Sequence, residues 1–476
     1  MRRTAMLLAL SLLTLVLGAA GADALNGSPA TPQPIVADVP PQNPFLAPDG
    51  TSSMHNDAYG TNAYQVGGPL GRSLQVTSRS YGVSECATIA FDSRGRIVGL
   101  CGGLQGFALR LIDPVTLRQI ATLTTSTRSL TSLSNPFADI CGGTYFYLDA
   151  HDVATVVTTA KTIIRVRVGA SSLTRIGTYD VAADVPGKDC LVATMPDWSG
   201  DIFFATQQGR VGVIAASTGA VHTIRFPGEG IFNSMSGDET GAVYVVTDHR
   251  LYAIAADADG VPRVRWSTAY DRGSVKKPGQ LSQGSGTTPT LLDDGLIAIT
   301  DNADPRMHVQ FYSRTGPTAG QLVCQAPVFG AGTSDTENSL AKAGPHSVVV
   351  ENNYGYRGVQ STIAGMTSSP GVAKVTEADG SCTVDWTNPI VAPTSVPKTS
   401  LANGLVYVYA KPRSNLLDDS WYLAALDIRT GRTQWMQRTG NGIQWNNHYA
   451  SIYLGPDGAA YIATLAGLIR FKDGAS

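Results

Sequence analysis

The sequence predicts an all-β protein, an eight-bladed β-propeller built from four-stranded antiparallel blades. Three observations point to this fold. Short β-rich runs joined by Asp, Asn or Gly turns recur along the chain, and each pair of runs is typical of a hairpin. A four-stranded unit returns roughly every 40–50 residues, which is a period typical of propeller blades. After the first 24 residues, no long segment has the 3.6-residue apolar period of a helix.

The repeating units set the expected order of the blades. They are predicted to begin near residues 83, 131, 188, 230, 283, 335, 396 and 442. The last unit has only three strands, so we expect residues 72–79, RSLQVTSR, to supply the fourth and close the ring, because closure removes an exposed sheet edge. Residues 131–180 are irregular, which leaves a seven-bladed propeller as an alternative. An array of two-sheet sandwiches is a further alternative.

The first 24 residues have the form of a secretory signal peptide. Arg2 and Arg3 precede an apolar run over residues 5–20, and an A-x-A sequence ends at Ala24. A membrane anchor is the alternative, but the run is short for a bilayer and no comparable run follows. Residues 25–53 are rich in proline and are predicted to be an extended lead segment, followed by one propeller domain over residues 54–476. We therefore expect a secreted or periplasmic protein without a membrane span.

The composition argues against a strongly charged partner. The formal net charge is −2 and charged residues make up only 15% of the chain. That balance is not the electrostatic footprint of a protein that binds nucleic acid or an anionic membrane surface. We expect a monomer whose partner is a small molecule or another protein.

Two stretches carry a resemblance to a known family. YLAALDIRTGRTQW at residues 422–435 resembles the repeat of pyrroloquinoline-quinone-type propellers, in which Asp, Thr-Gly and Trp recur in the outer half of a blade. MHNDAYGTNAYQVGGPLG at residues 54–71 is similar to the segment that leads into the first blade of such domains. The chain thus resembles the PQQ-like, or quinoprotein alcohol dehydrogenase-like, β-propeller superfamily. This resemblance implies the propeller fold over most of residues 54–474.

The superfamily includes quinone-dependent alcohol and sugar dehydrogenases, and also cofactor-free members that act as scaffolds. This sequence departs from the dehydrogenase pattern, because no two cysteines are adjacent and Trp435 alone clearly occupies the tryptophan position of the repeat. We therefore do not expect the quinone cofactor.

Polar residues gather at one end of the predicted hairpins. The innermost strand of a blade begins at the face where the second strand ends, because the two strands are antiparallel. These ends converge around the central channel, and concave openings with a few polar groups are preferred ligand sites. In turns, Asp and Asn also bond to the backbone, which is the alternative role for each residue. The predicted ligand-binding residues are Glu337, Asn338, Glu351, Asn352, Asp301, Asn302, Asp248 and Asn447.

Some of these oxygens suit a hard cation. Ca²⁺ accepts six to eight oxygen ligands in flexible geometry. By analogy with calcium-bearing lactonase and esterase propellers, which use Glu and Asn near the axis, the predicted metal ligands are Glu337, Asn338, Asn233 and Asp301. His448 is the candidate catalytic residue, since a histidine beside such an ion can act as a general base. Its alternative role is a satisfied polar contact.

Six cysteines in an exported chain predict disulfides rather than a zinc site, because none forms a C-x-x-C pair. Two flank the DSRG turn of the first blade almost symmetrically, within reach of a cross-strand bridge. Two lie near the starts of the second and third blades and could join them, although pairing between these two sets is also open. The last two lie on outer strands of the fifth and sixth blades. The six are Cys86, Cys101, Cys141, Cys190, Cys324 and Cys382.

Two functions from different classes follow from these features. The first is the binding of a small molecule in the axial funnel, with Ca²⁺ as a candidate cofactor and hydrolysis as a candidate reaction. The second is a non-catalytic scaffold outside the cytoplasm, which more often has an exposed apolar or aromatic face. The convergence of polar residues favours the first. A quinone-dependent dehydrogenase ranks third.

Overall fold

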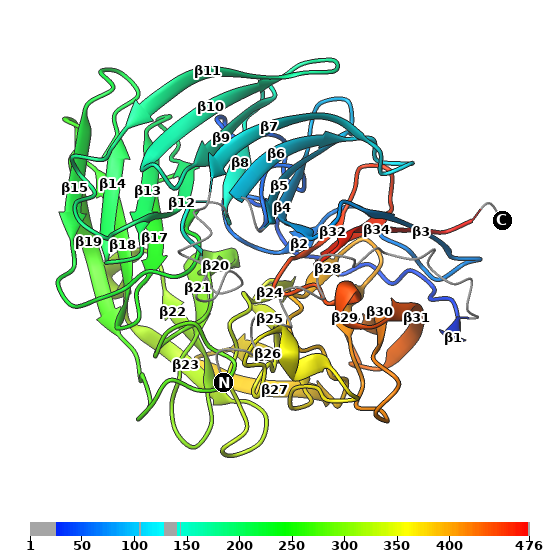
Figure 1. The fold of residues 1–476 in the computed structure, drawn as a ribbon. Coiled ribbons are helices and arrows are strands. Elements are labelled where there is room, and N and C mark those ends of the chain that lie inside the picture. Colours follow the sequence, from blue (N-terminus) through cyan, green and yellow to red (C-terminus); the bar gives the residue numbers. More distant parts are fainter. Residues whose placement is uncertain (1–24, 104–105, 128–139, 143, 475–476) are drawn as a thin grey trace, which may run out of the picture.

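A computed structural model describes residues 25–103, 106–127, 140–142 and 144–474. In this part of the chain, eight sheets surround a central axis (Figure 1), which confirms the predicted eight-bladed propeller and rules out the seven-bladed alternative. Each blade has four antiparallel strands, with the first strand innermost and the last at the rim. The predicted start of the second blade, residue 131, lies outside the described residues, and so does the predicted signal peptide, residues 1–24.

The first four blades follow the chain in order. Their strands are, in blade 1, β4 (Ser84–Phe91), β5 (Ile97–Gly103), β6 (Gly106–Ile112) and β7 (Gln119–Thr127); in blade 2, β8 (Phe146–Leu148), β9 (Val153–Val157), β10 (Thr162–Val168) and β11 (Leu173–Asp180); in blade 3, β12 (Leu191–Pro196), β13 (Ile202–Thr206), β14 (Arg210–Ile214) and β15 (Val221–Arg225); and in blade 4, β16 (Ser236–Gly237), β17 (Ala242–Val246), β18 (Arg250–Ala256) and β19 (Pro262–Ala269).

The last four blades complete the ring. Their strands are, in blade 5, β20 (Thr290–Leu291), β21 (Leu296–Thr300), β22 (His308–Ser313) and β23 (Leu322–Pro327); in blade 6, β24 (Ala341–Gly344), β25 (Ser347–Glu351), β26 (Val372–Ala378) and β27 (Ser381–Asn388); in blade 7, β28 (Lys398–Ser400), β29 (Leu405–Ala410), β30 (Ser420–Asp427) and β31 (Thr433–Asn441); and in blade 8, β32 (Ile452–Leu454), β33 (Ala460–Thr464) and β34 (Gly467–Lys472). Short 3₁₀ turns lie in the loops: η3 (Asp293–Gly295), η4 (Gly316–Thr318), η5 (Val359–Thr362) and η6 (Ile443–Trp445).

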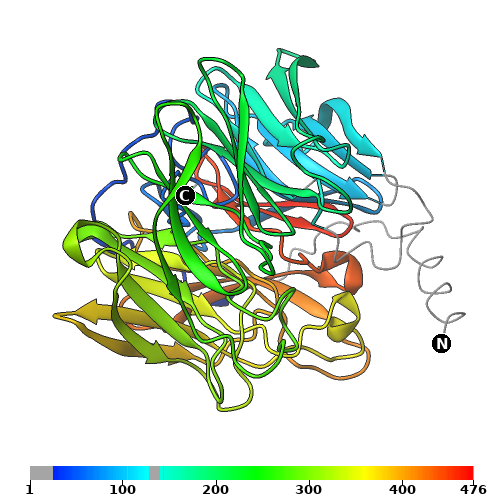
Figure 2. The same cartoon turned by 90° about the vertical axis from the view of Figure 1, so that its left-hand side faces the viewer.

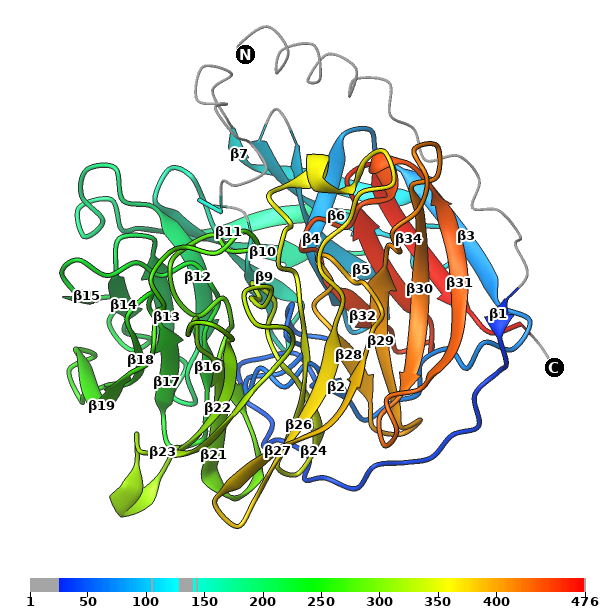
Figure 3. The ribbon, with the colours of Figure 1, turned by 90° about the horizontal axis from the view of Figure 1, so that it is seen from below.

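The ring closes as predicted, through a strand from the N-terminal side. Strand β3 (Gln75–Ser80) pairs with β34 over six residues and becomes the outer strand of blade 8 (Figure 3). Asp473 reinforces the junction, because its carboxylate accepts the backbone N–H groups of Leu70, Gly71 and Arg72. The first and last strands of the propeller therefore share one sheet, which leaves no open edge at the seam.

The strands of the inner ring are buried on both faces, because neighbouring blades pack face to face (Figure 2). Strand β29 reads LVYVYA and strand β33 reads AYIAT, and every residue of both is buried. Near-continuous apolar runs of this kind are expected where both faces of a strand are covered. Trp435, the tryptophan of the family-like repeat, is fully buried in the core cluster shared by blades 7 and 8.

The lead segment lies along the face of the disc where the hairpin turns are. Strand β1 (Asn26–Gly27) adds to the rim of blade 7 beside β31. The backbone N–H groups of Gln33 and Ile35 then donate to the carbonyls of Asn403 and Leu401. From there the segment runs towards the axis (Figure 3).

Residues 51–64 fill the channel on that same face, and we call them the axial plug. Its backbone carbonyls accept N–H groups from the innermost strands of blades 1, 2, 4, 5, 6 and 7 in turn: Thr51 from Phe91, Ser52 from Leu148, Ala58 from Gly237, Tyr59 from Leu291, Thr61 from Lys342 and Asn62 from Thr399. The plug ends in β2 (Ala63–Tyr64), which pairs in parallel with β28. The central channel is therefore closed at its turn face.

Three disulfides are present: Cys86–Cys101 between β4 and β5, Cys141–Cys190 between the segments that precede blades 2 and 3, and Cys324–Cys382 between β23 and β27. The pairings within each predicted set are thus confirmed, and pairing between the first two sets does not occur. Disulfides are typical of proteins that fold outside the cytoplasm. Among the described residues, no helix is both long and apolar enough to span a membrane.

The Cys324–Cys382 bridge is expected to stabilise the seam between blades 5 and 6. It closes a separation of 58 residues, so its loss releases chain entropy in the unfolded state and should lower the free energy of unfolding by about 2–4 kcal/mol. Replacing both cysteines with serine and measuring urea denaturation tests this. A midpoint equal to that of the wild type would contradict it, and reductant should shift the midpoint of the wild type but change that of the variant less.

Candidate functional site

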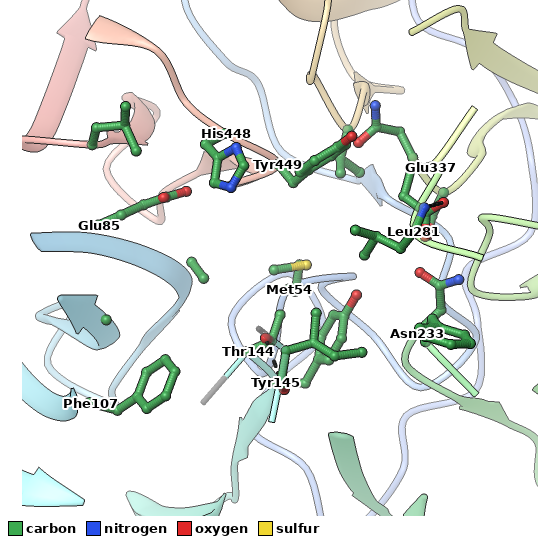
Figure 4. A pocket seen from close by; sticks show the side chains of 18 of the residues that line it. Met54, Glu85, Phe107, Thr144, Tyr145, Asn233, Leu281, Glu337, His448 and Tyr449 are labelled. Carbon is green, nitrogen blue, oxygen red and sulfur yellow. Dashed lines mark hydrogen bonds between the residues drawn. The ribbon is translucent and has the colours of Figure 1, made fainter. Parts of the chain in front are cut away.

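A pocket of about 140 Å³ lies on the axis, above the inner side of the plug (Figure 4). Its walls come from blades 1, 2, 4, 6, 7 and 8 and from the segment before blade 5, mainly from residues at or just before the innermost strands, and its floor comes from Met54 and His55 of the plug. Apolar groups such as Phe107, Phe232 and Leu281 cover much of the wall. The propeller therefore brings residues from distant parts of the sequence to one small cavity.

Glu337 lies in the segment before β24 and faces this pocket. One carboxylate oxygen, Oε2, accepts the backbone N–H of Leu281 at 2.9 Å, while Oε1 is buried and has no partner among the described residues. Burial raises the pKa of Glu337 to about 8, the bond from Leu281 opposes this, and the nearby Asp335 charge adds to it. Gly286 allows this placement, because a β-carbon at that residue would lie 2.2 Å from the carbonyl oxygen of Thr336.

Asn338 stands beside Glu337 on the pocket wall, and Glu351 supports it from the end of β25. The Asn338 amide donates to Glu351 Oε2 at 2.7 Å, and its own Oδ1 is buried without a partner in the described structure. Burial raises the pKa of Glu351 well above its ordinary value. The hairpin β24–β25 thus places Glu337 and Asn338 on the pocket and Glu351 one strand further out, as antiparallel pairing predicts.

Glu85 and His448 lie at the other end of the pocket, from blades 1 and 8 (Figure 4). Burial raises the pKa of Glu85 well above its ordinary value. His448 Nδ1 is 2.8 Å from the Tyr356 hydroxyl, and the backbone N–H of His448 donates to Asn446 Oδ1 at 2.7 Å. His448 and Tyr449 have φ values of 35° and 69°. Two successive non-glycine residues in this region cost of order 1–3 kcal/mol each, and such strain clusters at functional sites.

The floor of the pocket is an uncharged histidine. His55 Nδ1 is 3.0 Å from Asn62 Oδ1, an acceptor, so Nδ1 carries the proton and Nε2 carries the lone pair. Burial, together with the charge of Lys398, lowers the pKa of His55 to about 3. His55 Nε2 is buried and has no partner within the described ranges. The floor can therefore accept a hydrogen bond from a ligand.

Several predicted ligand residues lie away from the pocket, where they tie loops together. Asp301 accepts from the backbone N–H and Nδ1 of His308 at 2.6 and 2.8 Å, and so does not join Glu337, Asn338 and Asn233 on the pocket wall. Glu351 supports the wall from behind. The others, each bonded to backbone or side-chain groups of nearby loops, are Asp248, Asn302, Asn352 and Asn447. These contacts match the turn role that was the alternative for strand-end Asp and Asn.

Other lining residues were not anticipated from the sequence. Glu85 and Tyr145 lie at the starts of the innermost strands of blades 1 and 2, and Glu337 and Asn338 lie shortly before the innermost strand of blade 6. Inspection of the same hairpin end in every blade would therefore have found Glu85 and Tyr145. Met54 and His55 have no such signal, because only the folded chain brings the plug under the pocket.

The pocket offers oxygen atoms rather than a cluster of charged ligands. Within the described ranges, no group of three or more His, Cys, Asp or Glu side chains could hold a metal ion. The unpaired oxygens of Glu337 and Asn338 nevertheless fit a hard cation, which accepts amide as well as carboxylate oxygens.

A second and larger cavity, of about 650 Å³, lies next to the pocket, and we call it the vestibule. Residues 275–281, before blade 5, and residues 354–360, between β25 and β26, form most of its wall. It shares Leu281, His448 and Tyr449 with the axial pocket, so these three side chains form a partition between the two cavities.

Comparisons with known proteins give information about the fold. No family model matches the chain. A protein of Archaeoglobus fulgidus that is itself uncharacterised is 27% identical over 327 residues, which are 62% of this chain and 63% of the relative, so the match spans less than two thirds of that protein's length.

Two solved structures cover most of the chain. A europium-containing methanol dehydrogenase matches with a TM-score of 0.56 and 13% identity, over 88% of this chain and 90% of the other. The quinohemoprotein alcohol dehydrogenase from Comamonas testosteroni matches with a TM-score of 0.57 and 13% identity, over 91% and 82%. At this identity the likeness concerns architecture. The chain therefore shares its propeller fold with these two solved structures.

Proposed function

We propose that this protein binds a small molecule in the axial pocket. The observation that carries the proposal is a small cavity, closed below by the plug, in which the buried and unpaired oxygens of Glu337 and Asn338 face largely apolar walls. Ligand sites combine an apolar lining with a few convergent polar groups in this way. A cavity of about 150 Å³ holds a benzene molecule, so the part of the ligand that enters is of that size.

Ca²⁺ is the cofactor proposed for this pocket. Glu337 Oε1 and Asn338 Oδ1 would hold it, with Asn233 as a third oxygen ligand from blade 4. When bound, such an ion polarises an oxygen atom of the ligand as a Lewis acid. In the described structure, Glu337 Oε1 and Asn338 Oδ1 are buried acceptors without donors, and each costs about 1–3 kcal/mol. A bound cation would relieve this cost.

Hydrolysis is the reaction that His448 could assist. The Tyr356 hydroxyl lies 2.8 Å from His448 Nδ1 and 3.4 Å from Asn446 Oδ1. When Tyr356 donates its proton to Asn446, the Nδ1–H of His448 donates to the Tyr356 oxygen, and Nε2 carries the lone pair that a general base needs. Tyr356 is thus a positioning residue that selects the tautomer.

The same pocket does not fit the quinone of the structural neighbours. Its described lining residues include two carboxyl groups, Glu85 and Glu337, and no lysine or arginine. Pyrroloquinoline quinone is a tricyclic molecule with three carboxyl groups, so it is both larger than the cavity and of the wrong charge. We derive no step through a quinone.

The scaffold alternative has one supporting feature. Leu416 and Leu417, in the loop between β29 and β30, are 72% and 88% exposed. A scaffold role would not explain the unpaired oxygens of the axial pocket, so ligand binding is the function proposed.

Calorimetry on the EDTA-treated protein tests the cofactor. We expect Ca²⁺ to bind with measurable heat and to raise the melting temperature, because it pairs oxygens that are otherwise buried and unpaired. The control is Asp259→Asn, which also removes one carboxylate but at an exposed turn, and this variant should bind Ca²⁺ as the wild type does. If neither heat nor a thermal shift accompanies Ca²⁺, the metal part of the proposal fails.

A further inference from the structure

The vestibule has a charge character that the axial pocket lacks. Three cationic side chains, Lys276, Lys277 and Arg357, line it, against one carboxylate, Asp304. Among the described residues that line the axial pocket, there are two carboxyl groups and no lysine or arginine. The two adjoining cavities therefore favour different parts of a molecule: an uncharged part inside and an anionic part outside.

Lys277 is a buried member of this group. Its Nζ donates to the backbone carbonyl of Ala303 at 2.6 Å, and the nearest carboxylate oxygen, on Asp304, is 3.8 Å away. Asp304 itself accepts from the backbone N–H and hydroxyl of Ser274, both at 2.7 Å. A buried ammonium is stabilised by a close anion, and among the described residues the closest carboxylate oxygen is 3.8 Å from Lys277 Nζ. The vestibule thus contains a cation that a ligand anion can approach.

Other acidic groups act on Lys277 from behind it. Burial lowers the pKa of Lys277, and the charges of Asp304, Asp335, Asp301 and Asp271 oppose this shift. Of these four, Asp304 lines the vestibule and the other three do not. Asp301 is paired with His308, and Asp335 accepts the backbone N–H of Gly279 at 2.9 Å. Asp271, Asp301 and Asp335 therefore act on Lys277 without covering the side that faces the cavity.

The other two cations are closer to solvent. Lys276 Nζ donates to the carbonyl of Leu281 at 3.0 Å, beside the partition. Arg357 is exposed, and within the described structure it has no ion pair. Both side chains are long enough to turn towards an anion at the mouth of the vestibule.

From these contacts we infer that the vestibule holds the anionic group, a carboxylate or a phosphate, of a ligand whose apolar end enters the axial pocket. This inference rests on the proposed function and names the class of ligand: a compact ring or short alkyl group joined by a few atoms to an anion.

The partition can open for such a ligand through Leu281. Tyr449 is anchored by a bond from its hydroxyl to the carbonyl of Gly279 at 3.0 Å, and His448 by Tyr356. The Leu281 side chain is held by apolar packing alone, at the edge of the core cluster of blades 3 and 4. Rotation of this one side chain would join the two cavities, and Leu281→Ala should therefore tighten the binding of a spanning ligand.

The test uses matched probes, 4-phenylbutyrate and its neutral amide, with 3-phenylpropyl phosphate as the phosphate arm. The phenyl group suits the inner cavity. By calorimetry at low salt, we expect at least one anion to bind about tenfold more tightly than the amide, as one or two partly exposed ion pairs allow. The difference should shrink as ionic strength rises. The tighter of the two anions identifies the natural head group as carboxylate or phosphate.

Variants separate the inference about the vestibule from the proposed binding of a ligand in the axial pocket. Lys276→Gln with Arg357→Gln should reduce the preference for the anions, because Lys277 is then the one lysine or arginine left among the described vestibule residues, and should leave amide binding unchanged. Arg225→Gln, on the outer strand of blade 3, removes an exposed cation from neither cavity and should behave as the wild type. Equal binding of anion and amide by the wild type would overturn the vestibule inference alone. Binding of no probe by the wild type or by Leu281→Ala would overturn both it and the axial pocket as the ligand site.

Discussion

Glu337→Gln should raise the melting temperature of the calcium-free protein at pH 8 and abolish the response to Ca²⁺. The Glu337 carboxyl has a pKa of about 8 in the folded protein, above its ordinary value of 4.5. The unfolded chain therefore loses this proton first as pH rises, and stability is lost between about pH 4.5 and pH 8. Glutamine has no proton to lose, so the variant should keep its stability over that range.

The same pKa predicts how Ca²⁺ binding depends on pH. The ion binds the ionised carboxylate, so binding below pH 8 releases one proton, and the affinity should rise about tenfold per pH unit between pH 6 and 8. Thermal melts with and without Ca²⁺ across this range, on the wild type and on Glu337→Gln, give both results. If Glu337→Gln still binds Ca²⁺, Glu337 is not a ligand of the ion. If the metal-free variant loses stability with pH just as the metal-free wild type does, the raised pKa of Glu337 is contradicted.

Lys398→Ala should lower the free energy of unfolding by about 3–6 kcal/mol, as a buried side chain is truncated and a buried acceptor loses its donor. Lys398 is buried on β28, where its Nζ donates to the carbonyl of Met54 at 2.5 Å and also to Asn62 Oδ1. Because Met54 and Asn62 belong to the axial plug, the variant should also loosen the floor of the pocket.

Lys398→Met separates these two effects. Methionine keeps most of the buried volume, so its stability should lie between those of the wild type and the alanine variant, while the plug still loses its donor. Urea denaturation measures the stability, and hydrogen exchange of residues 51–64 measures the plug. Protection of the plug amides equal to that of the wild type in both variants would show that Lys398 is not its anchor.

The architecture could be predicted from the sequence because its determinants are local and repeated. Each hairpin carries its own turn residues, as at the DSRG turn between β4 and β5, and each strand carries its own apolar run. Closure by β3 followed from counting strands in the last unit, since an unpaired edge is unfavourable. The predicted blade starts precede the observed first strands by between 1 residue, in blade 1, and 10 residues, in blade 8, and the predicted start of blade 2 lies outside the described residues.

The candidate site could be predicted only where one hairpin decides the geometry. Glu337 and Glu351 lie on the same hairpin, and antiparallel pairing alone places both at the funnel end. Asp301 has the same sequence context, yet His308 satisfies its carboxylate and keeps it off the pocket. Which strand-end side chain faces a ligand and which ties a loop depends on partners that no local pattern reveals.

From sequence alone, eight blades were favoured over seven, and the seam and the hairpin end that carries Glu337 and Asn338 could be predicted, because turn chemistry and strand pairing act over short separations. The tertiary structure alone decided that residues 51–64 plug the channel, that Glu85 and His55 join Glu337 around one cavity, and that Lys277 lines the next. Those contacts join residues hundreds of positions apart, as Lys398 does with Met54. They exist because the closed ring brings every innermost strand to one axis, where a few side chains share a small and largely apolar space.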